Sequence, residues 1–189
     1  MAKGKKSNVK NVLLLAVLVV LVVGFFIIKS KQMAINKDAS KGKVTDVDIL
    51  IEKDLELYYP ETPREVVKLY SNMIKTLYSG IDDEKIEALA LKIRELYDKE
   101  FLAHNPEDRY IADLYSEIAI WNKANRKITN VILGDKIETY TKNDMEFATI
   151  KVSYTIEEKS KEIERKHYIL RKNEKGQWKI LGWELDGTE

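Results

Sequence analysis

The chain has 189 residues, with 32 Lys plus Arg, 31 Asp plus Glu and no cysteine. Without cysteine it can form no disulfide, thiolate nucleophile, cysteine-bound lipid or Cys-based metal site, and two distant histidines offer little to a metal. We therefore expect no cofactor. Residues 1–31 carry six lysines and no acid, so the remainder has a net charge of −5. This balance excludes a typical nucleic-acid-binding protein, which needs a concentrated basic face.

The first predicted element is a transmembrane helix at residues 12–28, which read VLLLAVLVVLVVGFFII without a polar or charged side chain. Such a helix rises about 26 Å, slightly less than a hydrocarbon core of about 30 Å, and the flanking lysines can make up the difference. The alternative is a secretory signal peptide, since residues 1–11 form a basic leader. Cleavage needs small residues after the apolar run, whereas Lys29-Ser30-Lys31-Gln32-Met33 follow it. We therefore favour an uncleaved anchor.

The orientation of this anchor does not follow from charge, because lysines lie close to both of its ends. The short leader resembles that of signal anchors, which have a cytoplasmic N-terminus. On this basis we expect residues 1–11 to form a basic cytoplasmic tail and the C-terminal domain to be extracytoplasmic. The expected location is the cell membrane, crossed once.

A polar tether is predicted at residues 29–58. Thr45-Asp46 can begin a short helix inside it, followed by apolar residues from Ile49 to Leu55. The sequence leaves open whether this helix packs on the domain or continues towards the membrane. The domain proper is then expected at residues 59–189.

Three helices are expected next. Thr62-Pro63-Arg64-Glu65 has the capping-box pattern with proline in the first turn, and Ser79-Gly80 ends that helix. A second helix is predicted from Asp82 or Asp83 to about Leu102. The third is predicted behind Asn105 as N-cap, with Pro106 in its first turn, and ends at residues 122–126.

After Lys127 the apolar period changes to alternation, which is typical of strands. Strands are predicted at residues 128–140, 147–156, 163–171 and 177–185; the first is either one long strand or two segments joined by a bulge at Gly134-Asp135. Short polar turns require neighbouring strands to be antiparallel. The prediction is an α+β fold, with three helices packed on a curved four-stranded antiparallel sheet.

At this point the chain resembles a known family. A helix that begins with T-P-R-E, a restart at N-P-E-D and a final strand reading G-Q-W-K-I-L-G-W resemble the nuclear transport factor two-like fold, the cone-shaped superfamily that includes ketosteroid isomerase. From Tyr59 onward the chain is also similar to uncharacterised single-pass proteins of Gram-positive anaerobic bacteria. The resemblance implies a hollow between sheet and helices that holds ligands or catalytic groups.

Five residues lie on strands that could line such a hollow: Tyr154, Tyr168, His167, Trp183 and Glu184. None matches the motif of ketosteroid isomerase, so no catalytic residue is assigned. The alternative for the tyrosines is core packing, with each hydroxyl reaching the rim. His167 has charged neighbours and is expected to face solvent, and His104 is expected to cap a helix end.

The leading functional hypothesis is a membrane-anchored extracytoplasmic domain without catalytic activity that binds an envelope protein or a small apolar ligand. Assembly subunits of bacterial type IV secretion and conjugation machines resemble it in having a short tail, one membrane helix and a domain of this fold. The alternative is an enzyme acting on a small apolar substrate in the hollow. It would require a buried carboxylate or histidine that faces the cavity.

Overall fold

The computed structural model describes residues 45–186. The basic tail, the transmembrane helix predicted at residues 12–28 and most of the tether lie outside this part of the chain. The described residues from Asp46 onward form one compact unit. Among the residues that the structure describes, no helix has the length and apolar character needed to cross a membrane.

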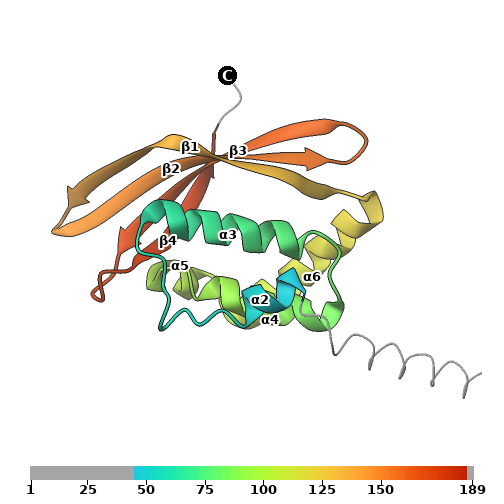
Figure 1. Ribbon diagram of the computed structural model, residues 1–189, viewed down its shortest axis with the longest axis horizontal. Coiled ribbons are helices and arrows are strands. Elements are labelled where there is room, and N and C mark those ends of the chain that lie inside the picture. Colours follow the sequence, from blue (N-terminus) through green and yellow to red (C-terminus); the bar gives the residue numbers. More distant parts are fainter. Residues whose placement is uncertain (1–44, 187–189) are drawn as a thin grey trace, which may run out of the picture. The chain divides into compact units, whose positions relative to one another are not determined.

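This unit is α+β, with a four-stranded antiparallel sheet and a helical layer on one face of it (Figure 1). The strands form a meander in the order β1-β2-β3-β4, as predicted. Helix α3 lies next to the sheet, and α4 packs against α3. The helices are α2 (Asp46–Ile51), α3 (Pro63–Leu77), α4 (Asp83–Arg94), α5 (Lys99–His104) and α6 (Glu107–Ala124). The strands are β1 (Lys127–Lys142), β2 (Met145–Glu157), β3 (Lys161–Lys172) and β4 (Trp178–Leu185).

Helix α3 begins with the predicted capping box. The Thr62 hydroxyl accepts a hydrogen bond from the Glu65 backbone N–H at 3.2 Å, and the Glu65 carboxylate accepts one from the Thr62 N–H at 3.1 Å. Two orphan donors of the first turn are thereby satisfied. The chain leaves the helix through Gly80, whose φ of +82° is open to glycine without strain. One side of α3 is buried, through Val66, Val67, Tyr70, Met73 and Leu77.

The sheet has one buried face, and β2 shows it most clearly. Its inward residues are almost fully buried, as the alternation predicted: Ala148, Ile150, Val152, Tyr154 and Ile156. The turn from β1 to β2 consists of Asn143 and Asp144, with φ of 51° and 60°. Positive φ at both positions of a two-residue turn fits the type I′ geometry that matches the twist of a hairpin.

The second predicted helix is wrong in its length, because α4 ends at Arg94 and a separate helix, α5, follows. Between them, Leu96 and Asp98 hydrogen-bond to the free edge of β4. The Ile180 N–H donates to the Leu96 carbonyl at 2.9 Å, and the Asp98 N–H donates to the Ile180 carbonyl at 2.8 Å. This pairing covers the edge of β4 at Ile180. Helical periodicity continues across the break, so the sequence pattern alone did not reveal it.

The start of α6 also differs from the prediction. Asn105 does not cap α6, which begins at Glu107 behind Pro106. Asn105 instead closes α5, where its side-chain amide donates to the Phe101 carbonyl at 2.8 Å. Its own carbonyl accepts a hydrogen bond from Arg94 at 2.9 Å. The residue therefore satisfies backbone groups of the preceding helix end.

The short helix predicted behind Thr45 is present as α2, but it ends at Ile51 and does not reach Leu55, and it packs on the domain. Val47 and Leu50 of α2, together with Leu55, belong to the same buried cluster as the later helices and the sheet. Lys85 of α4 forms an ion pair with Asp48 at 2.6 Å. The packed core thus includes residues on the N-terminal side of residue 59.

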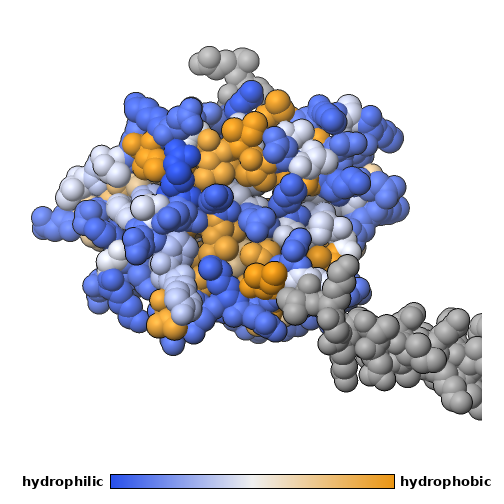
Figure 2. Space-filling model, in the orientation of Figure 1, coloured by the Kyte–Doolittle hydropathy of each residue, from blue (hydrophilic) through white to orange (hydrophobic). Residues whose placement is uncertain are grey.

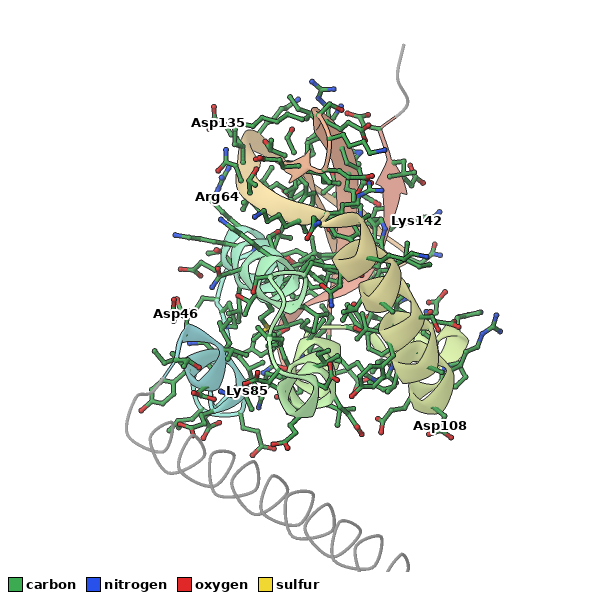
Figure 3. All side chains as sticks on the ribbon, turned by 90° about the vertical axis from the view of Figure 1, so that its right-hand side faces the viewer. Asp46, Arg64, Lys85, Asp108, Asp135 and Lys142 are labelled. Carbon is green, nitrogen blue, oxygen red and sulfur yellow. The ribbon has the colours of Figure 1, made fainter. Side chains whose placement is uncertain are left out.

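Strand β1 is irregular at two places, and side chains of α3 contact both. The register shifts between Ile128 and Asn130, and again between Leu133 and Ile137, close to the predicted bulge. Lys75 donates to the Thr129 carbonyl at 3.0 Å. Arg64 donates to the carbonyls of Gly134 and Asp135 at 2.7 and 2.8 Å, and Figure 3 shows it beside Asp135. The bulges leave carbonyls outside the ladder, and α3 supplies their donors.

A buried ion pair fixes α5 to β3. Asp98 is 3% exposed, and both of its carboxylate oxygens accept hydrogen bonds from the Arg171 guanidinium, which also contacts Glu100 at 2.9 Å. Asp98 additionally caps α5 by accepting from the Glu100 N–H at 2.8 Å. The bond to Asp98 raises the pKa of Arg171. One carboxylate thus joins a helix start to a strand, in the bidentate geometry that arginine favours.

We expect Asp98→Ala to lower the free energy of unfolding by about 3 kcal/mol, because it removes the buried counter-ion of Arg171 and the cap of α5. Asp98→Asn keeps a capping side chain and should cost about 2 kcal/mol. Denaturant unfolding followed by circular dichroism measures both. The control is Lys99→Met, which removes an exposed ion pair to Glu174 at 3.9 Å and should leave stability unchanged. Equal effects of Asp98→Asn and Lys99→Met would contradict the assignment.

Candidate ligand cavity

A cavity of about 520 Å³ lies between the helices and the sheet. Its floor is buried, whereas Arg109, Asp113 and Glu117 on α6 are exposed, so the cavity reaches the surface along that helix. The volume falls in the usual range for small-molecule sites. Its aromatic lining comprises Tyr70, Tyr78, Tyr97, Phe101, Tyr110, Trp121, Tyr154, Tyr168 and Trp183. The other lining residues are Ile74, His104, Asn105, Arg109, Asp113, Leu114, Glu117, Ile128, Ile156, Glu164 and Lys166.

The floor contains a chain of hydroxyl groups. The Tyr154 hydroxyl lies 2.8 Å from the Ser71 hydroxyl and 2.8 Å from the Tyr168 hydroxyl. These side chains come from β2, α3 and β3, and each is at most 2% exposed. Alternation along two paired strands places both tyrosines inward, and the buried side of α3 carries Ser71. Three elements distant in sequence therefore share one buried polar network.

Aromatic rings form the walls around this network. The Tyr70 ring meets Tyr168 edge to face at 5.5 Å, and Trp183 lies 5.8 Å from Tyr168. Phe101 of α5 meets Trp183 at 5.3 Å. Tyr78 and Trp121 pack at 4.3 Å on the side towards α6. Contacts of this kind hold the rings in fixed orientations, which gives the cavity a defined shape.

Burial raises the pKa of the cavity phenols, because a phenolate would lose its hydration there. The affected residues are Tyr70, Tyr78, Tyr97, Tyr110, Tyr154 and Tyr168. After burial, the negative charge of Glu117 contributes to the raised pKa of Tyr78, and that of Glu164 to the raised pKa of Tyr154. At neutral pH the cavity therefore presents neutral hydroxyls, which donate and accept hydrogen bonds.

Two charged residues on the inward face of β3 line the cavity. Glu164 and Lys166 form an ion pair at 3.0 Å, and both side chains are partly exposed. The Lys166 ammonium lies over two rings of the lining, 5.6 Å from the Tyr154 centroid and 5.5 Å from the Trp183 centroid. Inward positions opposite packed helices are ordinarily apolar. Charges at these positions mark where the helical layer does not close against the sheet.

The structure places the five residues proposed from sequence on two different faces. Tyr154, Tyr168 and Trp183 line the cavity. His167 and Glu184 lie opposite each other in the ladder, on the other face of the sheet. Successive strand residues point to opposite faces, so the neighbours of Tyr168 and Trp183 cannot share their cavity. Neither His167 nor Glu184 belongs to the site.

Several lining residues were not anticipated from the sequence. Tyr70 lies on α3, Tyr97 between α4 and α5, and Tyr110 on α6. Glu164 and Lys166 did carry a signal, because they share a strand face with Tyr168. A pair of charges in line with a buried tyrosine indicates a strand face that is only partly covered.

The geometry defines an α+β domain with a tyrosine-rich cavity between its sheet and its helical layer. Within residues 45–186, no group of histidines and carboxylates is placed to hold a metal ion. The chain belongs to the family described as Domain of unknown function (DUF6715), which matches residues 1–183. A search of curated proteins finds no match.

Because the phenols have raised pKa values in the folded protein, the native state keeps protons that the unfolded chain loses near pH 10. Their contribution to stability is complete below about pH 10 and is lost as the pH rises towards the higher native values. We expect the denaturant midpoint to fall above about pH 10. Replacing Tyr168 with Phe should make this decline shallower, as measured by denaturant unfolding at a series of alkaline pH values. If the denaturant midpoint of this variant fell with pH as steeply as that of the wild type, Tyr168 would not contribute to the decline.

Proposed function

We propose that the protein is a membrane-anchored binding module, whose nuclear transport factor two-like domain holds a small amphipathic ligand in the cavity between sheet and helices. The observation that carries the proposal is the lining: aromatic rings surround neutral hydroxyls at the floor, and charged groups stand at the mouth. Such a surface fits a ligand with an apolar body and few polar groups. The order of helices followed by a four-stranded meander supports the assignment of the fold family.

The anchor and its orientation are part of the proposal. The apolar run at residues 12–28 supports the anchor, and the short basic leader supports a cytoplasmic N-terminus. The face seen in Figure 2 is largely hydrophilic, with hydrophobic areas between charged side chains. We therefore propose ligand binding in the cavity rather than docking through the hydrophobic areas of that face.

Binding is favoured over catalysis by the state of the cavity groups. Glu164 is the half-buried carboxylate of the lining, and it is already paired with Lys166 at 3.0 Å. Burial keeps the phenols protonated, so they do not act as bases near neutral pH. The lining is nevertheless neither filled nor wholly apolar, as the enzyme alternative requires. A substrate would have to separate Glu164 from Lys166 before this carboxylate could take a proton.

The first test uses a cavity-filling variant of the full-length protein in detergent. We expect the neutral dye N-phenyl-1-naphthylamine to bind saturably, with enhanced fluorescence, and Ile74→Trp to weaken binding by about tenfold or more because it adds bulk to the lining. Ile132→Trp is the matched control, because Ile132 is 58% exposed and lies outside the lining. Partition of dye into micelles is common to all three proteins. Equal binding by the wild type and Ile74→Trp would contradict the proposal.

The second test uses the absence of cysteine, which leaves no background for thiol labelling. Ser160→Cys places a thiol at the exposed turn between β2 and β3, and Ser7→Cys places one before the apolar run. In intact cells a membrane-impermeant maleimide should label the Ser160→Cys variant and should reach the Ser7→Cys variant only after permeabilisation. The reverse pattern would overturn the proposed orientation, and labelling of both in intact cells would argue against an anchor with a cytoplasmic tail.

A further inference from the structure

Cations lie against the rings that line the cavity. The Lys166 ammonium is 5.6 Å from the Tyr154 ring centroid and 5.5 Å from that of Trp183. Arg94 lies over Tyr110 at 5.2 Å, and Arg126 lies over Trp121 at 4.6 Å. The electron-rich faces of aromatic rings attract cations, most strongly where water is excluded. The walls of the cavity therefore offer surfaces that suit positive charge.

Of these cations, Lys166 belongs to the cavity lining. Its side chain is 24% exposed, and its flexible stem carries the ammonium over two rings and beside Glu164. A positive group between aromatic faces and a carboxylate is the arrangement that proteins use to bind organic ammonium ions. The ammonium of Lys166 thus lies at the position that the cationic head of a ligand would take.

The remaining charges at the mouth also favour a cation. Three carboxylate residues of the lining, Asp113, Glu117 and Glu164, stand against two basic residues, Arg109 and Lys166. Arg109 is paired with Asp113 at 3.6 Å, and Lys166 with Glu164 at 3.0 Å. An anionic ligand would have to compete with Glu164 for Lys166 or with Asp113 for Arg109, and it would also meet the charge of Glu117. A cationic ligand needs only to displace Lys166, which can swing towards solvent.

We propose that the ligand of this cavity is a small organic ammonium compound, whose cationic head replaces the Lys166 ammonium between Tyr154, Trp183 and Glu164. The apolar part of the ligand lies against the buried rings, and the hydroxyls of the floor receive its polar substituents. The inference rests on the proposed function, because it names the chemical class of the molecule that the cavity holds.

Three probes of nearly equal shape test the charge preference in the full-length protein: choline, its neutral analogue 3,3-dimethylbutan-1-ol and the anion 3,3-dimethylbutanoate. Binding is followed by calorimetry and by tryptophan fluorescence, to which Trp121 and Trp183 of the cavity lining contribute. We expect choline to bind at least about tenfold more tightly than the neutral alcohol, and the anion to bind most weakly.

The sign of the effect at Lys166 is the sharper test. Lys166→Met should strengthen choline binding by roughly threefold or more, because it removes the internal competitor and frees Glu164. Glu164→Gln should weaken choline binding by about tenfold, because it removes the counter-ion. Lys151→Met is the matched control, since Lys151 is exposed, pairs with Asp186 at 2.9 Å and lies outside the lining. It should leave choline binding unchanged, and thermal unfolding of each variant shows that it is folded.

Each other outcome rejects the inference. If the neutral alcohol binds as tightly as choline, or if Lys166→Met weakens choline binding, the site is not selective for cations. In either case, the proposed function would still hold if any probe displaced the naphthylamine dye from the cavity. If no probe binds and the dye does not distinguish wild type from Ile74→Trp, the inference and the proposed function fail together.

Discussion

The structure depends on how the helical layer is held to the two edges of its sheet. At β1, Arg64 and Lys75 donate hydrogen bonds to carbonyls that the bulges leave outside the ladder. These residues are eleven positions apart on α3, which is about three turns and about 16 Å. The stretch from Thr129 to Gly134 spans about the same length of strand. The spacing of Arg64 and Lys75 along α3 therefore matches the spacing of the two register shifts in β1.

At the opposite edge the backbone itself makes the connection. Leu96 and Asp98 exchange hydrogen bonds with Ile180 on β4, and the Asp98 carboxylate binds Arg171 on β3. An edge strand left open would expose unpaired backbone groups to other chains. Interrupting the helical segment between α4 and α5 provides the cover. The helical layer is thus held at both edges of the sheet. The cavity reaches solvent between α6 and β3.

Much of the fold follows from local sequence patterns, whereas the site depends on tertiary contacts. The capping box at Thr62 and the inward alternation of β2 are consequences of hydrogen bonding and burial within a few residues, so they could be predicted. The break after Arg94 could not, because its cause is a contact with Ile180, far along the chain. His167 and Glu184 alternate with Tyr168 and Trp183 along their strands, so the period of a strand already predicts that they lie on the other face of the sheet. The helical side of the cavity required knowledge of how α3, α5 and α6 pack.

The pairing of Leu96 and Asp98 with β4 has a consequence for the order in which this domain assembles. Along the chain the described helices precede the sheet, and β4 follows β1, β2 and β3, so the edge that receives residues 96–98 is made after the other three strands. The meander joins strands that are neighbours in sequence and can form through short loop closures. Before β4 is present, residues 96–98 lack the backbone partner that they have in the folded domain. The connection of the 96–98 segment to the sheet is therefore the part of the helical layer that depends on β4.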